Sequence, residues 1–117
     1  MIRVARTALE RERGLGGLAY LSPDDGMLFP FAMPTTNPFW NKDTFVALDI
    51  AFLDARGRIL EIQPLRSLAE SHGRLEQTVP AWPYTYALEM PRGWFAWRRL
   101  APGDEINIPR IFADGTT

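Results

Sequence analysis

The stretch FWNKDT, residues 39–44, and an aspartate soon after it could bind a small molecule or perform acid/base chemistry. Trp40 offers a large apolar surface and one N–H donor. Lys42 is the only lysine among 13 basic residues, and its compact ammonium is not equivalent to a guanidinium. Asp49 lies in the apolar run ALDIAFLD, where a carboxylate must find a partner or have a raised pKa.

Two interpretations of these residues stay open. In the structural one, residues 41–44 form a polar turn or β-bulge with a solvated Lys42. Asp49 then accepts backbone N–H bonds or pairs with an arginine. In the functional one, Trp40, Lys42, Thr44 and Asp49 line a polar pocket, with Asp49 as the counterpart of Lys42.

The composition excludes several kinds of site. The chain has no cysteine, which rules out disulfides, thiolate metal ligands and thiol catalysis. His72 is the only histidine and no GxSxG motif accompanies it, so we expect neither a metal site nor a hydrolase triad. The run GLGGL at 14–18 follows an expected helix and lacks GK[ST], which favours a helix end and turn over a phosphate loop. We therefore expect no metal and no cofactor.

Size and charge limit the class of protein. The chain has 117 residues, of which 46% are hydrophobic and 23% charged, so we expect one domain over 1–117. The net charge of −1 predicts no nucleic-acid partner. No apolar run approaches the roughly 20 residues of a membrane span, and the N-terminus lacks the apolar region of a signal peptide. We expect a soluble chain and leave its compartment open.

The first half of the chain predicts four elements that would position these residues. MIRVART reads as a strand, and Thr7 with Glu10 forms a capping box that predicts a helix over ALERER ending at Gly14. MLFPF at 27–31 predicts a short strand that lies at an edge or carries a bulge, because Pro30 has no N–H. FVALDIAFLD and RILEIQPL predict a hairpin around Gly57, with its first strand covered on both faces.

The second half predicts fewer regular elements. Residues 66–83 read as a long loop with one helical turn, and YTYALEMP as a strand that turns Glu89 toward solvent. A short helix over about 93–100 and a last strand, EINIP, should follow. Residues 109–117 form a C-terminal tail without a clear pattern.

Together these elements predict an α+β fold with a mostly antiparallel sheet. We expect a small barrel-like or sandwich domain of six to seven strands with two short helices, because the strands follow one another through hairpins and loops.

Five segments in order resemble the bacterial and archaeal family called domain of unknown function 192. The segments are RGLGGL, DDGMLFPF, FWNKDTFVALDIAFLDARGRI, YALEMPRG and PGDEI, and they span about residues 2–108. The resemblance implies a small, mostly antiparallel, barrel-like α+β domain without an established biochemical function. It also implies that many members carry a leader or lipoprotein signal, which this sequence does not show. The positions that match the family signature are Arg13, Gly14, Leu15, Gly26, Met27, Leu28, Phe29, Trp40, Lys42, Thr44, Leu48 and Asp49.

Our leading hypothesis is a non-catalytic binding or accessory module. Its pocket, near Trp40, Lys42, Thr44 and Asp49, would take a small anionic or polar ligand such as a carboxylate or a sugar. The first alternative is an enzyme in which Asp49 or Lys42 performs acid/base catalysis. The second alternative is an interaction domain that meets a partner protein through an exposed sheet edge such as MLFPF.

Overall fold

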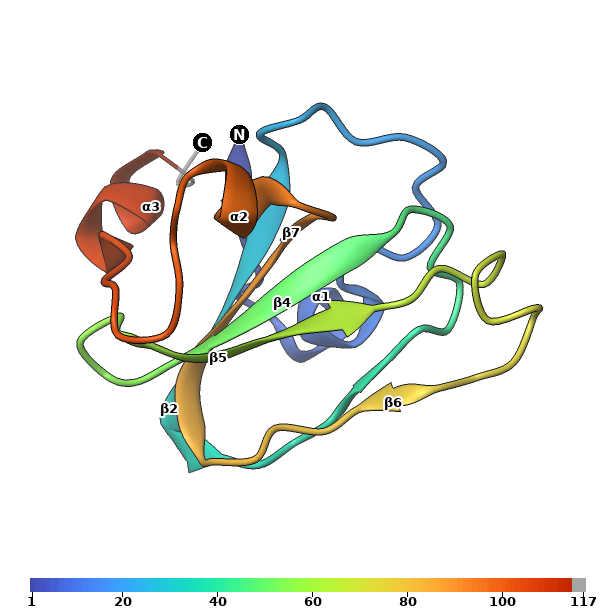
Figure 1. Ribbon diagram of the computed structural model, residues 1–117. Coiled ribbons are helices and arrows are strands. Elements are labelled where there is room, and N and C mark those ends of the chain that lie inside the picture. The colour runs from blue at the N-terminus through green and yellow to red at the C-terminus, as the bar shows by residue number, and fades with distance from the viewer. Residues whose placement is uncertain (115–117) are drawn as a thin grey trace.

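A computed structural model of the chain describes residues 1–114, and its centre is a five-stranded sheet in the order β1-β2-β7-β4-β5 (Figure 1). Strand β1 runs parallel to β2, and the other neighbours are antiparallel. The strands of this sheet are β1 (Ile2–Val4), β2 (Gly26–Thr35), β4 (Leu48–Leu53), β5 (Ile59–Leu65) and β7 (Tyr84–Pro91). Strands β3 (Phe39–Trp40) and β6 (Gln77–Thr78) pair separately as a short antiparallel ribbon.

The observed fold confirms an α+β class with a mostly antiparallel sheet. The sheet is open, with β1 and β5 at its two edges, and it does not close into a barrel. The described residues contain three short helices, one more than the sequence predicted: α1 (Ala8–Arg13), α2 (Trp94–Trp97) and α3 (Ile108–Asp114). None of these helices is long and apolar enough to cross a membrane.

Helix α1 forms where its capping box predicts it. The Thr7 hydroxyl accepts the Glu10 N–H at 3.0 Å, and the Glu10 carboxylate accepts the Thr7 N–H at 2.9 Å. Hydrogen bonds from the backbone N–H groups of Arg6 and Thr7 to this carboxylate lower the pKa of Glu10. The helix ends at Gly14, whose φ of 53° and ψ of −131° lie where a side chain is strained. The chain then leaves the helix and turns back over the sheet.

The β4–β5 hairpin also forms as predicted. Its turn is held by the Asp54 carboxylate, which accepts the N–H groups of Arg56 and Arg58, both at 2.9 Å. Gly57 adopts a φ of 86° and packs so closely that an added Cβ would lie 2.5 Å from the carbonyl oxygen of Ile106. Both faces of β4 are buried, as the apolar residues on both sides of this strand predicted.

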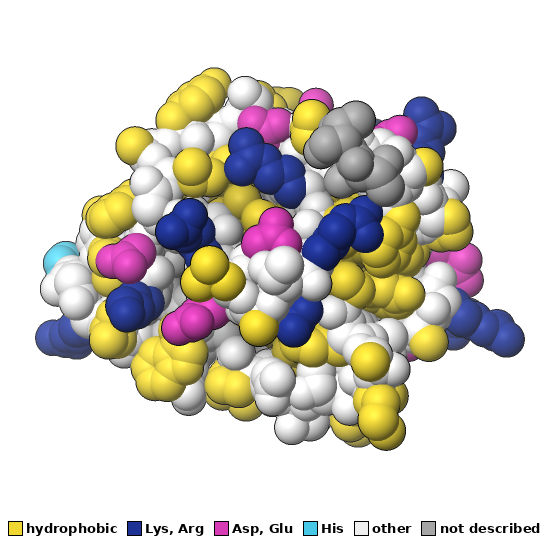
Figure 2. Space-filling view, turned by 180° about the vertical axis from the view of Figure 1, so that it is seen from behind, with side chains coloured by type: hydrophobic (Ala, Val, Ile, Leu, Met, Phe, Trp, Pro, Cys, Tyr) yellow, Lys and Arg dark blue, Asp and Glu magenta, His cyan; other side chains and the backbone are white. Residues whose placement is uncertain are grey.

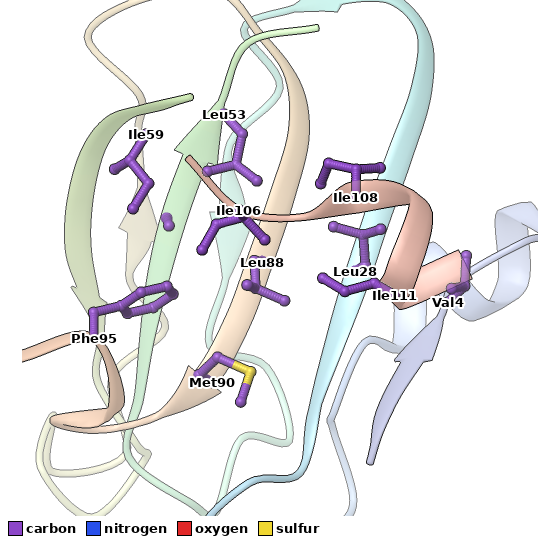
Figure 3. Packing of buried hydrophobic residues seen from close by; sticks show 11 residues of the cluster. Val4, Leu28, Leu53, Ile59, Leu88, Met90, Phe95, Ile106, Ile108 and Ile111 are labelled. Carbon is purple, nitrogen blue, oxygen red and sulfur yellow. The ribbon is translucent and has the colours of Figure 1, made fainter. Parts of the chain in front are cut away.

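Two hydrophobic clusters fill the two faces of the sheet. On the α2/α3 face, strand residues such as Leu28 and Leu88 pack against Phe95 of α2 and against Ile108 and Ile111 of α3 (Figure 3). On the aromatic face the core residues are Ala5, Leu15, Met27, Phe29, Leu48, Ile50, Phe52, Leu65, Tyr84 and Ala87. Helix α1 lies behind β4 and β5 in Figure 1, and the β3–β6 ribbon lies along the lower border of the fold.

The end of the chain corrects two expectations. Residues 105–109 were predicted as a strand, but they make one isolated bridge, Glu105 to Arg58, and then enter α3. The alternating Ile106 and Ile108 are buried against the α2/α3 face, so their spacing reflects packing and not strand pairing. Residues 109–114, predicted as part of a patternless tail, all belong to α3, and residues 115–117 lie outside the described part.

The MLFPF segment is not an exposed edge. Strand β2 lies between β1 and β7, and Met27, Leu28 and Phe29 are buried. Strand β1 pairs only as far as Leu28, so the missing N–H of Pro30 leaves no gap in that pairing. The register with β7 shifts between Pro30 and Thr35, which confirms the predicted irregularity at the proline.

Candidate ligand-binding cavity

A cavity of about 450 Å³ lies over the aromatic face of the sheet. Residues 11–16, from the end of α1 and the loop after it, form one side, and residues 37–44, around β3, form another. The sheet strands β2, β4 and β7 supply the floor. This volume is within the range of sites that hold small organic molecules.

Aromatic side chains form much of the cavity wall. Phe29 and Phe39 meet edge to face with ring centroids 5.1 Å apart, and Phe31 meets Tyr84 in the same way at 5.5 Å. The Tyr84 hydroxyl donates a hydrogen bond to the Asn37 carbonyl oxygen at 2.7 Å, and burial raises the pKa of this phenol. A wall of this kind favours an apolar or aromatic ligand body.

Three cations, Arg11, Arg13 and Lys42, line the same cavity, and we call them the rim cations. Arg11 and Arg13 come from the last turn of α1, and Lys42 comes from the turn after β3. None of the three makes an ion pair within residues 1–114. Figure 2 shows Lys and Arg side chains gathered in the middle of one face, among acidic and hydrophobic side chains. Unpaired cations beside a hollow attract an anionic group.

The turn that carries Lys42 has a defined backbone. The Thr44 N–H donates to the Asn41 carbonyl oxygen at 3.0 Å, and Asp43 takes a φ of 54°, which aspartate tolerates better than most residues. The Asp43 carbonyl oxygen accepts the Gly17 N–H at 2.8 Å, which ties this turn to the loop after α1. Residues 41–44 are therefore a polar turn, and the exposed Lys42 stands at the mouth of the cavity.

Asn41 is fully buried and holds the neighbouring loop. Its side-chain amide donates to the Ser71 hydroxyl at 3.2 Å and to the Arg74 carbonyl oxygen at 3.1 Å. Its side-chain oxygen accepts the Glu76 N–H at 2.7 Å. These hydrogen bonds hold the loop at 66–76 against the turn that follows β3. This role of Asn41 was not predicted from the sequence.

Of the four residues predicted to form a pocket, Trp40, Lys42 and Thr44 line the cavity, and Asp49 does not. Trp40 is half exposed, whereas Thr44 is buried. Asp49 points to the α2/α3 face, since side chains alternate along β4 and its neighbours Leu48 and Ile50 belong to the aromatic face. That these residues bind a ligand stays a prediction.

Asp49 has protein partners on its own side of the sheet. One carboxylate oxygen lies 3.0 Å from the Arg92 side-chain nitrogen Nε, and the other accepts the Gly93 N–H at 2.9 Å. The Arg92 guanidinium also pairs with Glu70 at 3.1 Å, and the pKa of Glu70 is lowered by the Ser67 N–H and by Arg92. These contacts match the structural interpretation of Asp49, in which it accepts a backbone bond and pairs with an arginine.

Glu89 is the carboxyl group that the structure brings to the cavity. The sequence predicted it to face solvent, but it is only 3% exposed, on the aromatic face of β7. Burial raises its pKa to about 8, opposed only by a hydrogen bond from the backbone of Leu15. Alternation along YTYALEMP predicts one solvent-facing side, whereas both faces of β7 are covered. The absence of other charges in YTYALEMP was the signal that could have shown this.

No group of three or more His, Cys, Asp or Glu side chains within residues 1–114 is placed to hold a metal ion. The cavity's polar groups are the rim cations, Glu12, Glu89, the Tyr84 and Thr44 hydroxyls and the Asn37 amide. This set suits an organic anion better than a metal, because cations outnumber carboxylates.

The family model of domain of unknown function 192 (DUF192), described as an uncharacterized ACR, matches residues 1–108. The chain belongs to the DUF192 family. The resemblance seen in the sequence is thereby confirmed. A search of curated proteins found no match to this chain.

Two solved structures share the fold of this DUF192 chain. The first, from Sinorhizobium meliloti 1021, is described as a candidate transcription regulator; it is 29% identical with a TM-score of 0.75, over 89% of this chain and 78% of that one. The second, from Novosphingobium aromaticivorans DSM 12444, is a protein of unknown function. It is 28% identical with a TM-score of 0.74, over 89% of this chain and 71% of that one.

Proposed function

We propose that this DUF192 chain is a non-catalytic binding module that holds a small organic anion in the cavity over the aromatic face. The observation that carries the proposal is that three rim cations, none of them ion-paired within residues 1–114, and an aromatic wall surround one cavity of about 450 Å³. The cations would hold the anionic group, for which a carboxylate is the best match, and the aromatic side chains would hold the body of the molecule.

Lys42 would be the principal anion contact among the predicted residues. It lies at the mouth of the cavity, where its ammonium group stays hydrated when no ligand is bound. Trp40 and Thr44 would support it, Trp40 as an apolar surface and Thr44 by fixing the turn. The Thr44 hydroxyl lies 3.4 Å from the Lys42 carbonyl oxygen, and the Thr44 carbonyl oxygen accepts the Leu68 N–H at 2.8 Å.

The enzyme hypothesis paired Lys42 with Asp49, and in this geometry the two residues do not face the same site. Lys42 lines the cavity, while Asp49 points to the other face and is bonded to Arg92 and Gly93. An acid/base role would instead fall to Glu89. Burial raises the pKa of this carboxyl group, and a hydrogen bond from the backbone of Leu15 opposes that rise. No titratable side chain within residues 1–114 is hydrogen-bonded to Glu89, which favours binding over proton relay.

The description of the Sinorhizobium protein as a candidate transcription regulator does not require this chain to bind DNA. The net charge of −1 gives little general attraction to phosphate backbones. A module that binds an organic anion would suit a sensing part of a regulatory system equally well.

Binding of benzoate, observed by protein NMR titration, tests the proposal. We expect saturable shifts in amides that line the cavity, and we expect Lys42→Ala to weaken binding about tenfold through loss of a charge-assisted contact. Arg56→Ala is the matched control, because Arg56 is an exposed cation in the β4–β5 turn, outside the cavity. The proposal fails if benzoate leaves the cavity amides unmoved, or if Lys42→Ala and Arg56→Ala bind it equally well.

A further inference from the structure

Glu89 occupies the middle of the sheet. On β7 it stands directly opposite Met27 of β2 on one side and Ile50 of β4 on the other. Both neighbours are buried and apolar, and the carboxyl oxygen Oε1 has no hydrogen-bond partner within residues 1–114. A buried polar atom without a partner is costly and uncommon in folded proteins, so this one calls for a ligand or a role.

Gly14 lies directly over Glu89, and the carboxyl oxygen Oε1 is shielded from solvent, so the absence of a side chain at residue 14 limits how tightly this oxygen is covered. A Cβ built on Gly14 would lie 3.3 Å from Glu89 Oε1 and 3.3 Å from Phe29 Cζ. Gly14 and Glu89 both line the cavity, so the carboxyl group lies at its floor, beneath the end of α1. Two of the rim cations, Arg13 and Lys42, are exposed, whereas Glu89 is buried. A molecule whose anion sits at the rim would direct its other end toward Glu89.

The neutral form of the carboxyl group fits this position. Burial among apolar side chains disfavours the carboxylate and raises the pKa of Glu89 to about 8. A protonated carboxyl group has one O–H to donate, and Oε1 has no hydrogen-bond partner within residues 1–114. Its best partner is therefore an acceptor oxygen on the bound molecule.

We propose that Glu89 is a protonated hydrogen-bond donor at the cavity floor, selecting organic anions that carry a carbonyl-type acceptor at the end remote from their anionic group. This inference rests on the proposed function and adds the ligand class to it. It also assigns a ligand contact to a residue outside the four first predicted. A bound acceptor would stabilise the protonated form further, which links affinity to pH.

The direction in which affinity changes with pH follows from which protonation form of Glu89 binds the ligand. The protonated form receives the acceptor, so affinity is fully present below the pKa of the free protein, about 8. Above that pH, affinity falls by at most about tenfold per pH unit, because a proton must be taken up with the ligand. The other charged or titratable groups facing the cavity are Arg11, Glu12, Arg13, Lys42 and Tyr84. Strands β2 and β4 present only apolar residues there.

Two probes of similar shape test the selection. 4-Acetylbenzoate carries a carbonyl acceptor opposite its carboxylate, and 4-isopropylbenzoate replaces that acceptor with a methyl group. At about pH 6.5 we expect the wild-type protein to bind the acetyl probe about fivefold more tightly, as one added hydrogen bond allows. At about pH 9.5 this preference should disappear, because a carboxylate has no proton to donate.

Two substitutions isolate Glu89 and leave every other titratable group of the cavity in place. Glu89→Gln keeps an N–H donor, so it should keep the preference for the acetyl probe at both pH values. Glu89→Met keeps the length of the side chain without a donor, so it should bind both probes equally. Both variants remove a buried carboxyl group that has no partner for Oε1, so we expect both to fold.

The possible failures separate the two proposals. If the wild-type preference is the same at both pH values, or persists in Glu89→Met, the role of Glu89 is refuted. The binding function would still stand if Lys42→Ala weakened both probes. If neither probe perturbs the cavity amides, both proposals fail together. A carbon-13 titration of the Glu89 carboxyl group in the free protein gives an independent check. A midpoint near 8 is expected, and one near 4.5 would refute the donor.

Discussion

Gly14 covers Glu89: a Cβ on the glycine would stand 3.3 Å from the buried carboxyl oxygen Oε1 of the glutamate. The end of a helix and the centre of a sheet are thus brought together across the cavity. A side chain at residue 14 would crowd both Glu89 and Phe29 where these residues line the cavity.

Gly14→Ala should destabilise the protein and impair the cavity. Alanine is strained at a φ of 53° with a ψ of −131°, and its methyl group would crowd Glu89 and Phe29, so we expect a loss of roughly 1–3 kcal/mol in the free energy of unfolding. Gly17→Ala is the matched control, because Gly17 also has a positive φ, 82°, but nothing lies within 4 Å of an added Cβ. Urea unfolding and benzoate titration of both variants would measure this. Equal loss of benzoate affinity in both would contradict the crowding argument.

The stability of the protein should fall as pH rises because of Glu89. The unfolded chain releases this proton near its ordinary pKa of 4.5, whereas the folded protein holds it until about 8. Below 4.5 both states are protonated, and between these values each pH unit costs the fold about 1.4 kcal/mol. Glu89→Gln should remove this part of the slope. Chemical unfolding at several pH values would show it, and parallel pH profiles for the two proteins would exclude a protonated Glu89.

Asp49→Ala should destabilise the protein without weakening benzoate binding. The change removes the acceptor of the Gly93 N–H and one anion beside Arg92, and we expect a loss of about 1–3 kcal/mol in unfolding free energy. Arg110→Ala breaks an exposed ion pair with Asp114 and should change stability by no more than about 0.5 kcal/mol. A strong loss of benzoate affinity in Asp49→Ala, with stability unchanged, would restore Asp49 as a site residue.

Asn41→Ala should loosen the loop at 66–76. The substitution leaves the Glu76 N–H without its acceptor and removes one of the two donors to the Arg74 carbonyl oxygen, which keeps the Ser71 hydroxyl, and we expect a loss of roughly 1–3 kcal/mol. Hydrogen exchange of the Glu76 amide should become faster. The control is Asn37→Ala, since the Asn37 side chain is exposed and makes no hydrogen bond within residues 1–114. Unchanged exchange at Glu76 would mean that Asn41 does not hold this loop.

Local chemistry allowed much of the fold to be predicted. The Thr7 and Glu10 capping box and Gly14 fixed the bounds of α1, because their partners lie within one turn of the chain. The β4–β5 hairpin was predictable for the same reason, since its register is set by a short turn. Helix α3 was missed because its few residues form a helix only where Ile108 and Ile111 can pack on the sheet.

The sequence by itself determined the family, helix α1 and the β4–β5 hairpin. Only the tertiary structure decided which side of the sheet each carboxyl group faces. Because side chains alternate along a strand, Asp49 lies on the opposite face from Leu48, and Glu89 lies on the opposite face from Leu88. Alternation does not say which residues cover either face. Asp49 contacts Arg92 and Gly93, which lie more than 40 positions further along the chain, and Glu89 contacts the end of α1. These partners are distant in sequence, so their meeting depends on the packing of the whole sheet.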